Sequence, residues 1–287
     1  MLQQELDSLV PSRELSRRGF VKTTVGSGFA AAVLPVTAQT IKTGSDGLTV
    51  GEVTIPVGDF KMPAYRAQPA GKTKLPVILV ISEIFGVHEH IADVARRFAK
   101  LGYLAIAPEL FVRQGDAQSY GEIAKLLAEV ISKAPDKQVM GDLDATVAWA
   151  SANGGDTSRL GITGFCWGGR TTWMYAAHNP AVKAAVAWYG PVARSYFPGD
   201  KTALDVASNV KAAVLALYGG ADSGIPNETV EQMMAALKAA GNTKSELVIY
   251  PDTPHAFHAD YRPSYRKEQA EDGWKRATAW FKAHGVA

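Results

Sequence analysis

One glycine-rich turn constrains this chain more than any other feature. Residues 164–169 read Gly-Phe-Cys-Trp-Gly-Gly, and Cys166 at their centre is the only cysteine in the sequence. Small residues two positions before and after a nucleophile let a strand turn sharply into a helix, with the nucleophile at the tip. A short apolar run, 159–163, precedes the turn, and a helical pattern, 169–178, follows it. The pattern predicts a nucleophile elbow, and a buried structural cysteine is the alternative.

An aspartate and a histidine follow the cysteine in the order that such an elbow requires. Asp222 ends an apolar run that begins at residue 214, and His255 follows another run at 246–250. Both side chains are therefore expected just past the carboxyl ends of strands, where open α/β sheets build their sites. A turn or helix-capping aspartate and a loop histidine are the structural alternatives. The order and the strand-end placement together favour a catalytic set.

Short apolar runs alternate with helical patterns along most of the chain. The runs are 77–81, 104–107, 160–163, 184–188, 214–217 and 247–250, and the helical patterns include 91–99, 140–150, 228–239 and 268–284. Apolar runs without polar alternation are typical of parallel strands buried on both faces. The alternation predicts one α/β domain, 39–287, with a mostly parallel sheet between helices. Residues 49–57 and 62–66 could add an antiparallel hairpin at one edge.

The first 38 residues resemble an export signal rather than part of the fold. Residues 16–22 read Ser-Arg-Arg-Gly-Phe-Val-Lys, a twin-arginine motif, and a moderately apolar stretch, 25–36, follows. That stretch is too short and too rich in Gly and Ala for a membrane span. Residues 36–38, Val-Thr-Ala, fit a cleavage site. We expect the twin-arginine export machinery to deliver a periplasmic protein that begins near Gln39; an N-terminal amphipathic helix is the alternative.

The charge balance and the spacing of possible metal ligands argue against binding to nucleic acid or to a metal ion. The chain has 30 basic and 28 acidic side chains, without the basic stripe that nucleic-acid binding requires. Apart from the signal, no apolar run is long enough to span a membrane. The only dense histidine groupings are 88–90 and 255–258, and the first is expected to open a helix rather than to bind metal. A small-molecule substrate is the expected partner, with no metal and no organic cofactor.

Several segments around these residues resemble the dienelactone hydrolase family of α/β-hydrolases. The resemblance covers the chain from about residue 51 to its end and rests on the elbow and four further segments. These are 82–87 (Ser-Glu-Ile-Phe-Gly-Val), 102–111 (Gly-Tyr-Leu-Ala-Ile-Ala-Pro-Glu-Leu-Phe), 188–190 (Trp-Tyr-Gly) and 254–257 (Pro-His-Ala-Phe). Glu109 in the second segment replaces the aspartate that is usual in the family. The resemblance implies the α/β-hydrolase fold.

The resemblance also implies roles for individual residues. Cys166 would be the nucleophile, His255 the base and Asp222 the residue that orients His255. Glu83 would gate the thiol, because an exposed thiolate is prone to oxidation; a surface glutamate at a helix start is the alternative. The oxyanion would be held by two backbone N–H groups, those of Ile84 and Trp167.

Four side chains are candidates for contacting the substrate. Arg113 matches an arginine with which the family grips a substrate carboxylate, a task that suits a planar guanidinium. Family members that act on dienelactone have a second arginine four residues after the histidine, where this chain has Ala259. Arg262 is close in sequence and could substitute for it. Tyr120 and Tyr189 could line the pocket, or could simply be packed aromatic residues.

The predicted activity is the opening of a small lactone or the cleavage of a small ester through an acyl-thioester on Cys166. Two alternatives stay open. One is a carboxylesterase of broad specificity. The other is a binding or redox protein on a hydrolase scaffold, since a fold does not by itself imply activity. A redox sensor would need neither Asp222 nor His255, which favours the hydrolase.

Overall fold

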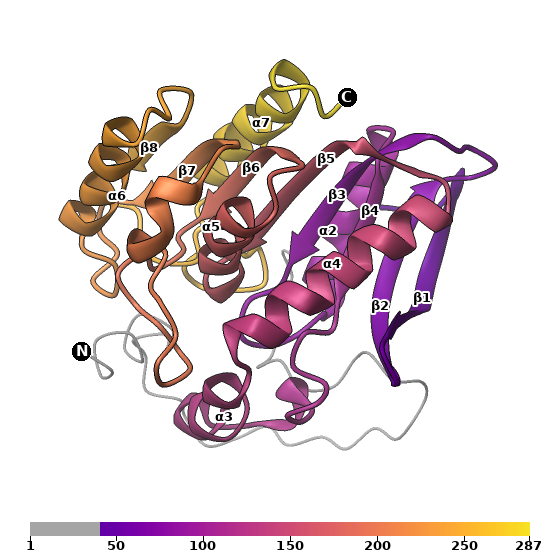
Figure 1. Ribbon diagram of the computed structural model, residues 1–287, viewed down its shortest axis with the longest axis horizontal. Helices are drawn as coiled ribbons and strands as arrows, with labels where there is room; N and C mark the ends of the chain where they lie inside the picture. The colour runs from indigo at the N-terminus through magenta and orange to yellow at the C-terminus, as the bar shows by residue number, and fades with distance from the viewer. Residues whose placement is uncertain (1–40) are drawn as a thin grey trace.

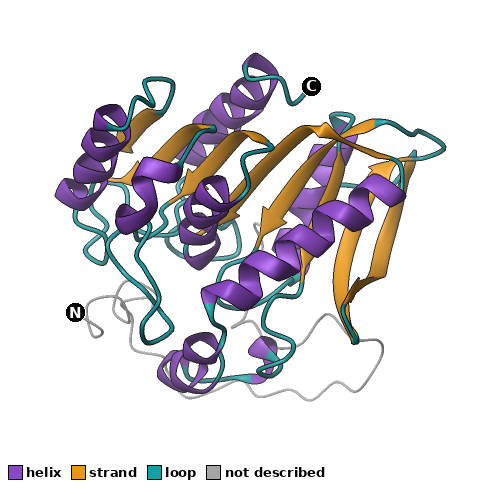
Figure 2. Ribbon diagram, in the orientation of Figure 1, coloured by secondary structure: helices purple, strands orange, loops and turns teal. Residues whose placement is uncertain are grey.

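A mixed sheet of eight strands, with helices on both faces, forms the part of the chain that the computed structural model describes, residues 41–287 (Figures 1 and 2). The strands are β1 (Leu48–Val57), β2 (Phe60–Pro69), β3 (Leu75–Ile81), β4 (Leu104–Pro108), β5 (Gly155–Phe165), β6 (Val182–Trp188), β7 (Ala213–Gly219) and β8 (Glu246–Tyr250). The predicted signal, 1–38, lies outside the described residues.

The order of strands across the sheet is β1-β2-β4-β3-β5-β6-β7-β8. β1 and β2 form an antiparallel hairpin, and β2 pairs antiparallel with β4. All pairs from β4 to β8 are parallel. The carboxyl ends of these strands therefore meet at one edge of the sheet, and Phe165 on β5 pairs with Trp188 on β6.

Helices cover both faces of the sheet. They are α2 (Glu89–Lys100), α3 (Ile123–Glu129), α4 (Asp136–Ala152), α5 (Trp167–His178), α6 (Asn227–Ala239) and α7 (Lys267–Ala283). In the view of Figure 1, α4 and α5 lie in front of the sheet and α2 and α7 behind it. The two rear helices meet at Phe98, whose ring lies 4.6 Å from Trp274 and 5.8 Å from Phe281. Every residue of β3, β4 and β7 is buried, as expected for parallel strands covered on both sides.

The predicted α/β-hydrolase architecture is confirmed, including the edge hairpin. Each of the six predicted apolar runs lies in a strand, and the predicted helical patterns lie within α2, α4, α5, α6 and α7 to within a residue or two. The short helix α3, which the sequence analysis does not predict, is a finding of the structure. No helix within residues 41–287 combines the length and apolar character needed to cross a bilayer.

Candidate active site

Cys166 stands at a strained turn between β5 and α5. Its φ of 54° and ψ of −116° place a side chain that is not glycine in a rarely adopted backbone region, a cost found mostly at functional sites. The neighbouring glycines make the turn possible: a Cβ on Gly164 would lie 2.2 Å from the carbonyl oxygen of Gly168. The backbone N–H of Cys166 donates to Trp188 O at 3.0 Å. The chain therefore makes the predicted sharp turn from strand to helix, with Cys166 at its tip.

Asp222 and His255 lie together at the same edge of the sheet. The Nδ1 nitrogen of His255 is 2.6 Å from Oδ2 of Asp222, and both residues are buried. The other ring nitrogen, Nε2, is buried without a hydrogen-bond partner among residues 41–287. Burial alone would lower the pKa of His255, but the charges of Asp222 and Cys166 outweigh it and raise that pKa to about 10. The aspartate thus fixes and charges a ring that also interacts with the cysteine.

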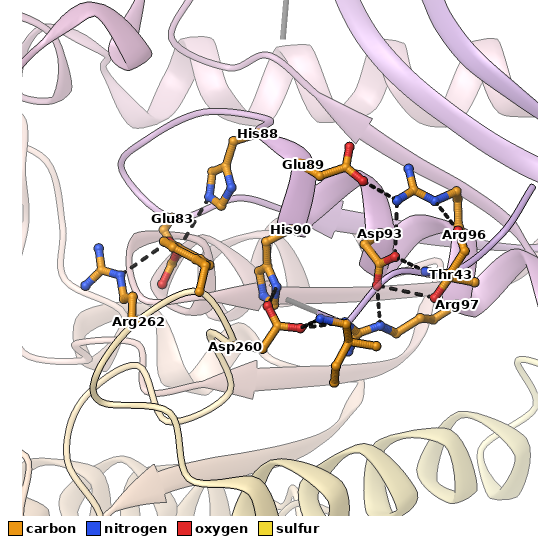
Figure 3. Close-up of polar contacts among 12 residues, drawn as sticks. Thr43, Glu83, His88, Glu89, His90, Asp93, Arg96, Arg97, Asp260 and Arg262 are labelled. Carbon is orange, nitrogen blue, oxygen red and sulfur yellow. Dashed lines mark hydrogen bonds and ion pairs between the residues drawn. The ribbon is translucent and has the colours of Figure 1, made fainter. Parts of the chain in front are cut away.

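Glu83, two residues beyond the end of β3, is buried in a polar cluster (Figure 3). Its Oε2 accepts a hydrogen bond from the hydroxyl of Tyr261 and lies 3.8 Å from Nε2 of His88. Burial would raise the pKa of this carboxyl, but the positive charge of Arg262 and the bonds from its neighbours hold the pKa far below its usual range. Glu83 is therefore ionised at every pH at which the protein is expected to work.

Arg262 belongs to the same cluster as Glu83. Its Nε donates to the Tyr261 hydroxyl at 3.3 Å, and its guanidinium lies over the ring of Phe85, 4.8 Å from the centroid. Burial would lower the pKa of Arg262, but neighbouring charges that include those of Glu83 and Cys166 raise it. The structure thus brings a permanently charged arginine into the electrostatic range of the cysteine, although Arg262 lies seven residues after His255.

The two predicted oxyanion donors come from adjacent segments. Trp167 is the first residue of α5, and Ile84 is buried in the loop after β3. A Cβ on Gly168 would lie 2.4 Å from the carbonyl oxygen of Ile81 and 2.5 Å from that of Ser82. The end of β3 therefore runs directly against the first turn of α5, and only a glycine permits that approach.

Tyr189 is the one predicted aromatic residue that lies in the site. It follows β6 with a φ of 37°, and its ring packs edge-on against His255 with the centroids 5.0 Å apart. Its hydroxyl is buried and has no hydrogen-bond partner within residues 41–287. Burial raises the pKa of Tyr189 well above its ordinary value, and the charges of Glu83 and Cys166 add to the effect. The Tyr189 hydroxyl is therefore a neutral group within the electrostatic range of Cys166.

Arg113 is not part of this cluster. Its guanidinium forms a two-pronged ion pair with the buried carboxylate of Asp142 on α4, at 2.5 and 2.8 Å. The guanidinium also stacks over Phe60, 4.1 Å from the ring centroid. The fork that the sequence assigns to a substrate carboxylate already binds a carboxylate of the protein. This ion pair joins the loop after β4 to α4.

Tyr120 also lies apart from the cluster. The residue is half-buried, and burial raises the pKa of its hydroxyl, with a further contribution from a hydrogen bond to Glu129 on α3. No hydrogen bond, ion pair or ring contact joins Tyr120 to Cys166, His255 or Glu83 within residues 41–287. Its interactions are those of a residue that holds the α3 segment.

Sequence reasoning missed two residues that contact Glu83. His88 is the residue directly before α2, and its ring lies near the carboxylate of Glu83. Burial lowers the pKa of His88, although Glu83 opposes that effect. Tyr261 precedes Arg262, and its ring lies 4.8 Å from that of His88. A buried carboxylate needs donors. Once Glu83 is expected to be a buried site residue, polar residues in the loops after neighbouring strands become candidates for its partners, and this reasoning could have identified His88 and Tyr261.

Comparisons with known proteins identify the family of the chain. Residues 62–285 match the model of the family described as "Dienelactone hydrolase family". A protein of Methylorubrum extorquens, provisionally named a carboxymethylenebutenolidase, is 58% identical over 99% of this chain and 98% of its own length. A protein of Escherichia coli K12 with the same provisional name is 52% identical over 92% of this chain and 97% of its own.

Solved structures resemble the chain as well. The crystal structure of a provisionally assigned dienelactone hydrolase from Klebsiella pneumoniae has a TM-score of 0.79 and 54% identity, and the match covers 82% of this chain and 98% of that one. A dienelactone hydrolase-like promiscuous phosphotriesterase from metagenomic libraries has a TM-score of 0.68 at 20% identity, over 83% of this chain and 99% of that one, which shows the shared fold alone. The fold, the elbow and these matches establish that the chain belongs to the dienelactone hydrolase family of α/β-hydrolases.

Proposed function

We propose that the protein is a cysteine-dependent hydrolase that opens a small lactone, or cleaves a small ester, carrying an anionic group near the scissile carbonyl. The observation that carries the proposal is the 2.6 Å contact between His255 and Asp222. It fixes Nδ1 on the aspartate and leaves Nε2 for the cysteine and for water, which is the arrangement of a nucleophile, a base and an orienting acid.

The reaction would take place in two steps. The Cys166 thiolate attacks the carbonyl carbon and forms a C–S bond, and the oxyanion binds the backbone N–H groups of Trp167 and Ile84. The C–O bond of the ester breaks, and the leaving oxygen takes a proton from His255. Water then attacks the thioester while His255 takes its proton, and the C–S bond breaks to release the acid and the thiolate.

Arg262 would select substrates and link their binding to Glu83. A substrate carboxylate near Arg262 competes with the ionised Glu83 for the same positive charge. Binding of an anionic substrate would therefore release Glu83 from the arginine and change the field at Cys166. This gives Glu83 the gating role that the family resemblance implies, and it supports anionic substrates over neutral ones.

Trapping the intermediate tests the proposal. Rapid mixing of the mature protein with an activated aryl ester should give a burst of product equal to the enzyme concentration. Mass spectrometry after acid quenching should find the acyl group on Cys166. A panel of lactones and esters, matched in size but with and without a carboxylate, then identifies the substrate class. Acylation of another residue, or binding without turnover, would reject the cysteine mechanism and favour the binding-protein alternative.

The location is a separate part of the proposal. The Arg17-Arg18 pair and the apolar stretch after it support export by the twin-arginine machinery to the periplasm. Replacing both arginines by lysine should retain the precursor in the cytoplasm, whereas the wild-type protein should be exported and begin near Gln39. Cell fractionation and N-terminal sequencing decide, and a stable uncleaved cytoplasmic form of the wild type would contradict the proposal.

A further inference from the structure

Asp260, one residue before Tyr261, joins three parts of the molecule (Figure 3). Its Oδ2 accepts a hydrogen bond from the backbone N–H of Ile41 at 3.1 Å and one from Nη2 of Arg97 at 3.0 Å. Its Oδ1 lies 3.0 Å from Nδ1 of His90. The carboxylate is only 3% exposed. None of these contacts is used by the proposed reaction.

The three partners of Asp260 come from two segments that lie far from it in the sequence. Arg97 and His90 both lie on α2, the helix that begins directly after His88. Ile41 belongs to the segment 41–43, which we call the strap. The strap is held a second time where Thr43 O accepts from Nε of Arg96 at 2.9 Å. Asp260 thus ties the loop that carries His255 and Arg262 to α2 and to the strap.

The loop after β8 is held by packing as well as by these bonds, because Ala256, Phe257 and Ala259 are fully buried. A cavity of about 290 Å³ borders the network, with Ile41, Arg97, His258 and Trp274 among the residues that line it. The backbone of the loop is also strained, because Ala256 has a φ of 58°. Apolar packing is not directional, whereas buried charge-assisted bonds are strong and directional, so such bonds add an orientation that packing alone does not supply. Asp260 provides such bonds directly before Tyr261 and Arg262.

We propose that Asp260 is a positioning residue that, anchored by the strap and α2, holds Arg262 and Tyr261 over Glu83 and so determines how tightly the site grips an anionic substrate. The inference rests on the proposed function of Arg262. Asp260 acts through Arg262 and does not touch the substrate itself.

Asp260→Asn tests the inference, because it keeps the size of the side chain but removes the charge. Even a small displacement of the Arg262 guanidinium should weaken its interaction with an anionic substrate. We therefore expect kcat/KM for an anionic ester to fall about tenfold, mostly through a higher KM. A neutral ester of the same size should change less than about twofold. In an Arg262→Gln background, Asp260→Asn should not lower the anionic-to-neutral ratio of kcat/KM any further. A ratio that falls equally in both backgrounds, or in neither, overturns the inference.

Asp142→Asn is the matched control. Asp142 on α4 is as deeply buried as Asp260 and also pairs with an arginine, Arg113, but among residues 41–287 it makes no hydrogen bond to the strap, to α2 or to the loop after β8. Its loss should lower thermal stability and leave the anionic-to-neutral ratio of kcat/KM unchanged.

The strap is tested by comparing two variants of Ile41. Ile41→Pro removes the N–H group from which Asp260 accepts a hydrogen bond, whereas Ile41→Ala keeps it. Only the proline variant should lower the ratio, and equal ratios for the two variants count against the strap.

A readout without substrate separates this inference from the proposed function. Cys166 is 1% exposed, so a loosened loop should let iodoacetamide label its thiol several-fold faster in Asp260→Asn, but not in Asp142→Asn. If Arg262→Gln leaves the anionic-to-neutral ratio unchanged, the anionic-substrate proposal fails, and the labelling rate then decides the inference. Labelling of Asp260→Asn at the wild-type rate, with an unchanged ratio, overturns the positioning role.

Discussion

The loop after β4 and the loop after β8 each carry an arginine that sequence reasoning assigns to a substrate carboxylate. In the first loop, both prongs of Arg113 bind the buried Asp142. In the second, Arg262 contacts Tyr261, and its charge acts on Glu83 beside the cysteine. The two arginines have the same charged group but different contacts, because each guanidinium binds the partner that the fold brings to it. Identifying an arginine in a motif does not establish that the arginine is available to a ligand.

The comparison of the two arginines matters for function only if hydrolysis depends on Cys166. Replacing Cys166 is therefore the first test, and it should have the largest effect. Cys166→Ala should remain folded and lose about four to six decades of kcat, and the double variant with His255→Ala should lose little more, because members of such a set act as a unit. Steady-state kinetics on an activated ester, with circular dichroism for the fold, measures this. Retention of a tenth of the wild-type activity would show that the thiol is not the nucleophile.

The pH dependence of kcat/KM tests the loop after β8, because the pKa of its His255 is raised far above the ordinary value of a histidine. Asp222→Asn should lower activity about a thousandfold or more. It should also lower the pKa of His255 from its value of about 10, because the Asp222 charge helps to raise that pKa. The imidazolium persists up to its folded-state pKa, so the alkaline limb of the kcat/KM profile should move to lower pH. An alkaline limb that stays in place would mean that another group controls it.

Arg262→Gln tests the comparison directly. A hydrogen bond to a charged group contributes about 1.5–3 kcal/mol, so kcat/KM for anionic esters should fall about ten- to a hundredfold. Neutral esters of the same size should change little. Equal losses on both kinds of substrate would remove the difference between the two arginines and favour a carboxylesterase of broad specificity.

Arg113→Ala should have the opposite signature. The variant leaves the buried carboxylate of Asp142 unpaired, which costs about 3–5 kcal/mol of unfolding free energy when one partner of a buried pair is removed. Any loss of activity should be equal on anionic and neutral substrates. Denaturant unfolding should show that adding Asp142→Asn recovers part of the lost stability. A selective loss on anionic substrates would instead return Arg113 to the substrate site.

Glu109 lies in the loop after β4, as Arg113 does. Its replacement should have the smallest effect, on the pH dependence of stability. Burial raises its pKa to about 7, although a bond from the N–H of Val87 opposes that effect. The folded state therefore holds this proton more tightly than the unfolded state, so the contribution of Glu109 to stability falls as pH rises from about 4.5 to 7. Glu109→Gln should stabilise the protein at pH 8 by up to about 3 kcal/mol and have little effect at pH 5. Urea unfolding at both pH values measures the difference, and equal effects would contradict the raised pKa.

The sequence predicts the fold better than it predicts the contacts of charged side chains. Periodicity and glycine spacing are local signals, so strand and helix positions and the elbow at Cys166 could be read from neighbouring residues. The short helix α3 escaped because its seven residues carry too little periodic signal. The order of Cys166, Asp222 and His255 predicted that they meet, because all three follow parallel strands.

What the sequence by itself determined is therefore the α/β sheet, the family and the residues at the carboxyl ends of its strands. Only the tertiary structure decided that Arg113 binds Asp142, that Arg262 acts on Glu83 with Tyr261 and His88, and that Asp260 joins their loop to α2. The physical reason is that hydrophobic periodicity acts over a few residues. A buried charge instead takes whichever partner the packed chain brings within hydrogen-bonding distance, often more than a hundred residues away.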